Sequence, residues 1–167
     1  DERPWPLGDR LATASPGSAK KPIEALVAEA LAGDRYGKSA RTSAVLDQIP
    51  LVRIRDHAPE TLFSVLSPGA HILPHRGVTN TRLVTHLPLI VPEECALVVG
   101  GEKREWREGE CFTFDDTFEH EAWNRGASTR VVMRMDCWNP RLTEVERDAV
   151  TLLVGAIGDF NREGGIN

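Results

Sequence analysis

The sequence has few cysteines, no long apolar run and no surplus of positive charge. Its three cysteines form no CxxC pair, which argues against a disulfide framework or a zinc ribbon and favours a reducing, cytoplasmic compartment. No stretch reaches the roughly 20 apolar residues of a membrane span, and no signal-peptide pattern opens the chain. The net charge of -5 argues against a general nucleic-acid binder, because phosphate binding requires an excess of Lys and Arg.

The composition is that of one globular domain. Hydrophobic residues make up 41% and charged residues 27% of the 167 residues, enough for one sizeable core but not for two ordinary domains. The chain begins with Asp1 rather than Met, so the sequence leaves its targeting and full-length context open. Its oligomeric state is open as well.

The first part of the chain is expected to lie outside the core. Residues 1–21 are rich in Pro, Gly and Ser without periodicity, which predicts an arm or linker. We expect residues 22–167 to form a single domain. Pro22 opens a short amphipathic helix that is predicted to end at Gly33.

From about residue 51 to residue 140 the pattern changes to short β-strands. Segments such as RLVTHLPLIV, CALVVG and TRVVMRMDCW are rich in β-branched and apolar residues, and several alternate apolar with polar positions. Gly, Pro and Asn separate these segments. Many short strands at close spacing predict an all-β sandwich, barrel or jelly roll.

The chain returns to helix at about residues 143–161. Thr143 and Glu146 fit a capping box, in which each side chain bonds the other's backbone amide. An apolar stripe follows at three-and-four spacing, which suits packing on the outside of a sheet. Its members are Val145, Ala149, Leu152, Leu153, Ala156, Ile157 and Phe160. The predicted architecture is therefore a β-core with flanking N- and C-terminal helices.

Two of the five histidines stand out by their placement. His75 ends one strand-like run before a turn, and His120 opens another after a turn. Histidines at the strand edges of a small β-barrel are a common way to build a metal site in its mouth, and neutral imidazoles suit iron, copper or zinc. In the His-x-Asp/Glu pattern of non-haem iron sites the carboxylate position is Gly77, so the pattern alone leaves this site incomplete.

Arg130 lies ten residues after His120, on the next predicted strand. A dicarboxylic co-substrate that chelates a metal at one end requires a cation at its other end. Arginine suits this role because its planar guanidinium binds a carboxylate bidentately and stays charged when desolvated.

The stretch from about Phe63 to Leu142 resembles the aspartyl/asparaginyl β-hydroxylase family. The resemblance rests on SPGAHILPHRGVTNTRLVTHLPL, WREGE, FDDTFEHEAWN and DCWNP, which occur in this order. It implies a double-stranded β-helix of the jelly-roll or cupin-like kind. It also implies a dioxygenase that uses Fe(II), 2-oxoglutarate and O2 to hydroxylate a C–H bond.

The resemblance also implies roles for individual residues. His75 and His120 would be the iron ligands. Arg130 would hold the distal carboxylate of 2-oxoglutarate, helped by Ser64 and His86 on neighbouring strands.

The missing carboxylate does not count against iron in this family. The family's own hydroxylase also has glycine at the position of Gly77, so two protein ligands suffice and water can fill the gap. Asp116, a few residues before His120, is expected to hold such a water and to contribute to catalysis.

The sequence departs from the family where the substrate binds. An arginine two residues before the equivalent of His86 contacts the acidic substrate in the hydroxylase, and here that position is Val84. Arg82 lies on the same face of the strand but farther along it. The substrate therefore stays open between a peptide and a small molecule.

Two other functions compete with hydroxylation. Gly77 leaves room for a halide, as in 2-oxoglutarate-dependent halogenases. A non-catalytic, cupin-like metal-binding module would keep the fold and its histidines but would consume no 2-oxoglutarate.

Overall fold

The computed structural model describes residues 45–55 and 61–164, and in these ranges eight strands precede one helix, α3. The arm predicted at residues 1–21 and the helix predicted from Pro22 lie outside the described residues. The strands are β1 (Thr61–Leu66), β2 (His71–His75), β3 (Arg82–Ile90), β4 (Cys95–Val99), β5 (Glu102–Glu105), β6 (Phe112–Phe114), β7 (His120–Asn124) and β8 (Arg130–Trp138).

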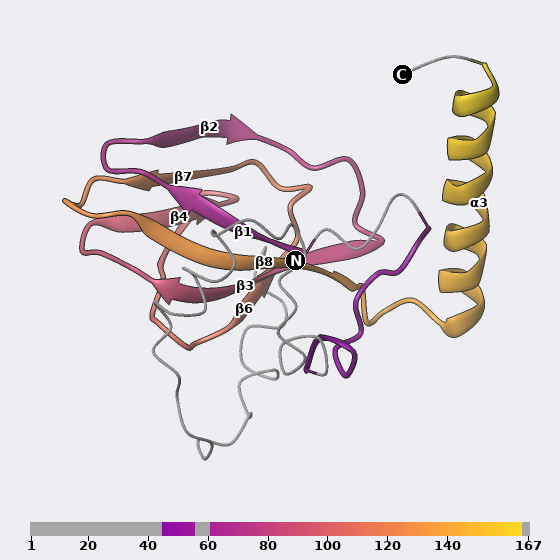
Figure 1. The fold of residues 1–167 in the computed structure, drawn as a ribbon, viewed down its shortest axis with the longest axis horizontal. Helices are drawn as coiled ribbons and strands as arrows, with labels where there is room; N and C mark the ends of the chain where they lie inside the picture. Colours follow the sequence, from indigo (N-terminus) through magenta and orange to yellow (C-terminus); the bar gives the residue numbers. More distant parts are fainter. Residues whose placement is uncertain (1–44, 56–60, 165–167) are drawn as a thin grey trace.

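The strands form two antiparallel sheets of four strands each. One sheet has the order β1-β8-β3-β6 and the other the order β2-β7-β4-β5. Figure 1 shows the two sheets as layers, with β2, β7 and β4 on one side of β1, β8 and β3. Strands that follow one another in sequence mostly lie in different sheets, which is the connectivity of a jelly roll. The predicted double-stranded β-helix is confirmed.

The space between the sheets holds the main core. It contains aromatic and aliphatic side chains from both layers, chiefly Val84, Cys95, Leu97, Val99, Trp106, Phe112, Phe114, Ala122 and Val132. All three cysteines are free, and Cys95 and Cys137 are buried, as expected for small apolar side chains.

A second cluster covers the outer face of β8. Leu51 packs there against Met135 and Cys137, with Leu46 and Ile49 beside them. The segment around Leu51 was expected to be a strand, but it makes only an isolated bridge to Cys137. β8 is therefore buried on both faces.

The helix α3 (Glu144–Glu163) begins at the predicted capping box. The Thr143 side chain accepts from the Glu146 amide, and the Glu146 carboxylate accepts from the Thr143 amide at 2.7 Å. No helix in the described ranges is both long and apolar enough to cross a bilayer.

The expected packing of α3 on a sheet is wrong. Leu152 is 76% exposed and Phe160 is 69% exposed, and Figure 1 shows the helix standing to one side of the strands. In the described ranges the outer face of β8 is covered by the segment around Leu51 and not by α3.

Candidate metal and co-substrate site

His75 and His120 face each other across neighbouring strands. His75 ends β2, His120 begins β7, and they are direct cross-strand partners after a register shift that follows Ile72. Their ring centroids are 4.1 Å apart. Both were predicted at strand edges, and the antiparallel pairing brings residues 45 positions apart in sequence into contact.

The hydrogen bonds of these two rings define which nitrogen is free. Nδ1 of His75 lies 2.8 Å from the Leu73 carbonyl oxygen, and Nδ1 of His120 lies 2.9 Å from the Phe118 carbonyl oxygen. A carbonyl oxygen only accepts, so in the neutral ring Nδ1 carries the proton and Nε2 carries the lone pair. Nε2 of each ring is therefore available to bind a metal, and the hydrogen bond from Nδ1 to the backbone fixes the orientation of the ring.

The Asp116 carboxylate lies in the space that a side chain at position 77 would enter. A Cβ at Gly77 would overlap this carboxylate, and the Gly77 amide donates to the Asp116 carbonyl oxygen at 2.7 Å. Asp116 is buried, and its Oδ1 has no hydrogen-bond partner among the described residues. A buried carboxylate oxygen without a partner is costly, so Oδ1 is suited to receive a donor such as a metal-bound water.

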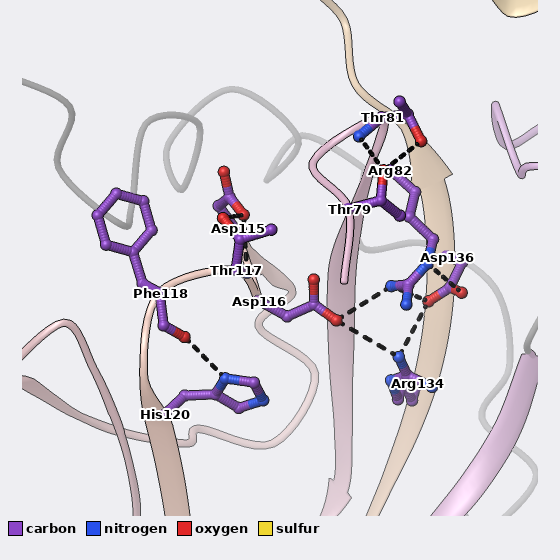
Figure 2. Close-up of polar contacts among 10 residues, drawn as sticks. All are labelled: Thr79, Thr81, Arg82, Asp115, Asp116, Thr117, Phe118, His120, Arg134 and Asp136. Atoms are coloured by element: carbon purple, nitrogen blue, oxygen red, sulfur yellow. Dashed lines mark hydrogen bonds and ion pairs between the residues drawn. The ribbon is translucent and has the colours of Figure 1, made fainter. Parts of the chain in front are cut away.

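Two arginines hold Asp116 in this orientation (Figure 2). Nη1 of Arg82 donates to Asp116 Oδ2 at 3.1 Å, and Nε of Arg82 lies 3.2 Å from Asp136 Oδ2. Nη2 of Arg134 lies 3.3 Å from Asp136 Oδ1 and 3.9 Å from Asp116 Oδ2. Two cations and two carboxylates balance within this network. The neighbouring Asp115 instead accepts from the amide and hydroxyl of Thr117, which makes it a turn residue.

Arg130 is a buried cation without a carboxylate partner in the described part of the chain. It is 1% exposed, and burial lowers its pKa to about 10. Its guanidinium contacts Ser64 Oγ at 3.4 Å and lies over the Trp106 ring, while Nε has no hydrogen-bond partner in the ranges that the structure describes. Buried charges are normally paired, so this guanidinium is suited to bind an anionic ligand.

His86 has the opposite tautomer to the two paired histidines. The Trp106 indole Nε1–H donates to His86 Nδ1 at 3.2 Å, so the neutral ring carries its proton on Nε2. Burial first, and then the positive charge of Arg130, lower the pKa of His86 to about 3. His86 is therefore a neutral hydrogen-bond donor rather than a cation.

All the predicted site residues meet in one cavity of about 300 Å³ between the sheets. They are Ser64, His75, His86, Asp116, His120 and Arg130. A larger surface hollow of about 540 Å³, lined by residues 92–94 and 125–128, contains no histidine.

The donor set fits a metal that needs few protein ligands. Within the described ranges no group of three or more His, Cys, Asp and Glu side chains is placed to hold a metal ion. Two imidazole nitrogens suit a non-haem iron ion that keeps open positions for other ligands, and Asp116 lies near enough to act through a bound water.

Three residues beside the site, Trp106, Arg134 and Asp136, were not predicted from the sequence. Arg134 and Asp136 lie four and six residues after Arg130 along β8. Because side chains alternate between the two faces of a strand, all three lie on the same, inner face. This alternation was the available signal for them. Trp106 lies in the WREGE stretch that carries the family resemblance, but nothing in the sequence pairs it with His86.

Fold and site together define a jelly-roll protein with a paired-histidine pocket and a buried, unpaired arginine. The profile of the aspartyl/asparaginyl beta-hydroxylase family matches residues 28–140. The chain belongs to this family, as the sequence motifs predicted.

The chain matches part of several longer relatives. It is 44% identical over 86 residues to the aspartyl/asparaginyl beta-hydroxylase of Mus musculus, which covers 51% of this chain and 12% of the relative. It is 46% identical over 93 residues to aspartate beta-hydroxylase domain-containing protein 2 of Mus musculus, which covers 54% of this chain and 27% of the relative. The matched region is thus roughly a quarter or less of each relative's length.

Solved structures with some likeness are cupin domains. One belongs to an XRE-family transcriptional regulator from Enterobacter cloacae, with 14% identity, a TM-score of 0.41 and coverage of 47% of this chain and 80% of that one. Another is a Cupin 2 conserved barrel domain protein from Salinispora arenicola CNS-205, with 15% identity, a TM-score of 0.36 and coverage of 47% and 60%.

Proposed function

We propose that this chain is a dioxygenase that binds Fe(II) and 2-oxoglutarate and hydroxylates a C–H bond of a peptide or small-molecule substrate. The observation that carries the proposal is Arg130. It is a buried guanidinium without a carboxylate partner in the described ranges, and it lines the same cavity as two histidines with free Nε2 lone pairs.

His75 and His120 would hold the iron through Nε2. Their Nδ1–H groups are bound to backbone carbonyls, so the rings need no rotation or tautomer change to coordinate. Asp116 would accept from a metal-bound water through its unpartnered Oδ1, and Arg82 keeps that carboxylate from turning away.

Arg130 would bind the distal carboxylate of 2-oxoglutarate. Ser64 Oγ lies beside the guanidinium on the neighbouring strand β1 and supplies a hydroxyl donor. His86 contributes the Nε2–H of a neutral ring. Bound iron, with 2-oxoglutarate and O2, would supply the oxidising chemistry that couples conversion of 2-oxoglutarate to succinate and CO2 with hydroxylation of the substrate.

The site favours hydroxylation over halogenation. Halogenation requires a halide in the space left by the glycine. Here the space beside Gly77 is filled by the Asp116 carboxylate, whose negative charge repels a second anion. Turnover in the presence of chloride tests this directly, since a chlorinated product would show that the chain is a halogenase.

This chain lacks the arginine that contacts the acidic substrate in the family's hydroxylase, because that position is Val84. Val84 is buried in the core and offers no charge. Arg82 is engaged with Asp116 and Asp136, so it is not available to a substrate carboxylate without breaking that network. We therefore propose a substrate in which recognition does not depend on an acidic side chain.

Anaerobic binding of Fe(II) and 2-oxoglutarate tests the proposal. We expect wild type to show the metal-to-ligand charge-transfer band of the ternary complex, and His120→Ala to lose it. His71→Ala is the matched control, because His71 shares strand β2 with His75 but pairs with Glu121 and does not line the cavity. A wild type without the band, or a His120→Ala variant that keeps it unchanged, would exclude the iron assignment.

A second variant separates co-substrate from metal. Arg130→Ala should weaken 2-oxoglutarate much more than Fe(II), because only the far carboxylate loses its partner. A charge-assisted hydrogen bond contributes about 1.5–3 kcal/mol, which corresponds to roughly 10- to 150-fold in affinity. Equal affinity for 2-oxoglutarate in both proteins would exclude Arg130 as the partner of the distal carboxylate, whereas a wild type that binds Fe(II) but no 2-oxoglutarate would support a metal-binding module.

A further inference from the structure

Trp106 contacts two members of the site through two different parts of its ring. It lies just after β5, is 4% exposed and lines the cavity. Its indole N–H donates to His86 Nδ1, and its ring face lies 4.7 Å from the Arg130 guanidinium carbon. The roles proposed for His86 and Arg130 toward 2-oxoglutarate do not by themselves explain either contact.

The indole N–H fixes which nitrogen of His86 faces the cavity with a proton. Indole is only a donor, so it can pair only with an unprotonated Nδ1. A neutral histidine in water exchanges freely between its two tautomers. In this site the bond to Trp106 selects the tautomer in which Nε2 donates, which suits a carboxylate or keto oxygen of a bound 2-oxo acid.

The ring face stabilises the buried cation without neutralising it. A carboxylate beside Arg130 would offset its desolvation but would also occupy the N–H groups that a ligand needs. The aromatic face attracts the guanidinium through its quadrupole and leaves the in-plane N–H groups free. In the described ranges Ser64 is the only side chain that accepts from this guanidinium.

We propose that Trp106 is the positioning residue of the co-substrate end of the site: its N–H sets the His86 tautomer, and its face holds Arg130 ready for an anion. This inference rests on the proposed function, since it assigns Trp106 to the binding of 2-oxoglutarate. The part that concerns the His86 tautomer can be tested in the protein without metal or co-substrate.

Two substitutions separate the two contacts. Trp106→Phe keeps an aromatic face and removes the N–H, so we expect about 3- to 10-fold weaker 2-oxoglutarate binding to the Fe(II)-loaded protein. Trp106→Leu removes both contacts, and we expect a loss of roughly 10- to 100-fold. The Fe(II) affinity of both variants should stay near that of wild type, because neither contact involves His75 or His120.

The matched control is Trp123→Phe. Trp123 also lies under an arginine, Arg125, at 4.9 Å, but it does not line the cavity. This variant should bind 2-oxoglutarate as wild type does. If Trp106→Phe creates a packing defect, a benzothienylalanine at position 106 replaces the N–H by sulfur and keeps both rings, so it tests the hydrogen bond alone.

The decisive readout is the nitrogen NMR spectrum of the imidazole rings in the metal-free protein. We expect His86 of wild type to be protonated on Nε2 alone, and the variants without the indole N–H to show a shift toward a mixture of tautomers. A merely structural Trp106 would change stability but not the tautomer. A wild-type His86 protonated on Nδ1, or a tautomer and affinity unchanged in Trp106→Phe, would overturn the proposal.

The outcomes for Trp106 and for the proposed function are distinguishable. If wild type failed to bind 2-oxoglutarate, the proposed function and the co-substrate role of Trp106 would both be excluded. The spectrum would still decide whether Trp106 sets the His86 tautomer. If wild type bound 2-oxoglutarate and all Trp106 variants bound it equally well, only the inference about Trp106 would be excluded.

Discussion

A Cβ atom at residue 77 would overlap the carboxylate of Asp116, so Gly77 and Asp116 occupy adjoining space beside the paired histidines. In a His-x-Asp/Glu site the carboxylate comes from the strand that carries the first histidine. Here a carboxylate reaches the same place from the turn before β7, and the glycine makes room for it. The two positions are therefore coupled.

This coupling predicts the behaviour of a swapped pair. Gly77→Asp should destabilise the protein, because overpacking a filled space costs about 1–3 kcal/mol and the two carboxylates repel. The double variant Gly77→Asp/Asp116→Gly removes the overlap and should recover both stability and Fe(II) binding. Urea unfolding and anaerobic Fe(II) titration measure the two effects.

The control for the swap is Gly155→Asp, since a Cβ at Gly155 meets nothing within 4 Å. It should change stability little. A Gly77→Asp single variant with wild-type stability and iron binding would show that the Asp116 carboxylate does not hold this space in solution.

Arg82 is expected to contribute to stability because it neutralises two buried carboxylates. Asp116 and Asp136 are 4% and 2% exposed, and Arg82 bonds to both. Removing one partner from a buried ion pair leaves an uncompensated charge, so Arg82→Ala should lower the free energy of unfolding by about 3 kcal/mol. Arg82→Lys should recover only part of this, because a single ammonium lacks the planar fork that spans both carboxylates.

The comparison for Arg82 is the exposed pair of Arg53 and Asp47 at 2.8 Å. Its side chains are 53% and 69% exposed, so Arg53→Ala should cost no more than about 1 kcal/mol. Chemical denaturation of both variants at pH 7 gives the two values. Equal losses would mean that the buried network contributes no more than a surface pair.

The buried, neutral state of His86 predicts a loss of stability in acid. Its pKa is about 3 in the folded protein against 6.5 in the unfolded chain, because burial and Arg130 disfavour the imidazolium. Below pH 6.5 the unfolded chain takes up a proton that folded His86 does not. The stability is therefore fully present above pH 6.5 and falls toward pH 3, by up to about 1.4 kcal/mol per pH unit.

His86→Gln removes this titration while keeping a side-chain amide. Its free energy of unfolding should fall less steeply than that of wild type when metal-free protein is compared at pH 7, 6 and 5. The slopes of the free energy of unfolding against pH should differ between the two proteins by up to the value for one bound proton, about 1.4 kcal/mol per pH unit. Parallel curves for the two proteins would mean that His86 is protonated in the folded state.

Local patterns in the sequence predicted several parts of the structure. The turn after His75 and the turn before His120 indicated where these two strands end and begin. The capping box at Thr143 could be predicted because it is defined by four consecutive residues. The family motifs then placed Ser64, His86 and Arg130 in one pocket, and the structure brings all of these side chains to the same cavity. Their roles toward iron and 2-oxoglutarate stay predictions.

Features that depend on what covers a surface could not be predicted. The outer face of β8 is covered by Leu46, Ile49 and Leu51, which come from a segment about 85 residues earlier in the chain, so no local pattern indicates this contact. The apolar stripe of α3 was expected to pack on the outside of a sheet, but Leu152 and Phe160 are exposed instead. The hydrogen bond from the Trp106 indole to His86 joins residues 20 positions apart in the sequence, so no periodic pattern predicts it.

The exposed α3 is expected to respond to a change in its cap independently of the β-core. Thr143→Ala removes the side-chain acceptor for the Glu146 amide, which costs about 1 kcal/mol of helix stability. Because α3 buries only Gly158, this loss should appear as faster hydrogen exchange in residues 144–163, while strands β3, β7 and β8 keep their protection. Thr151→Ala, which removes a hydroxyl bonded within the helix, is the matched control. Equal acceleration in the helix and the strands would show that α3 unfolds together with the core.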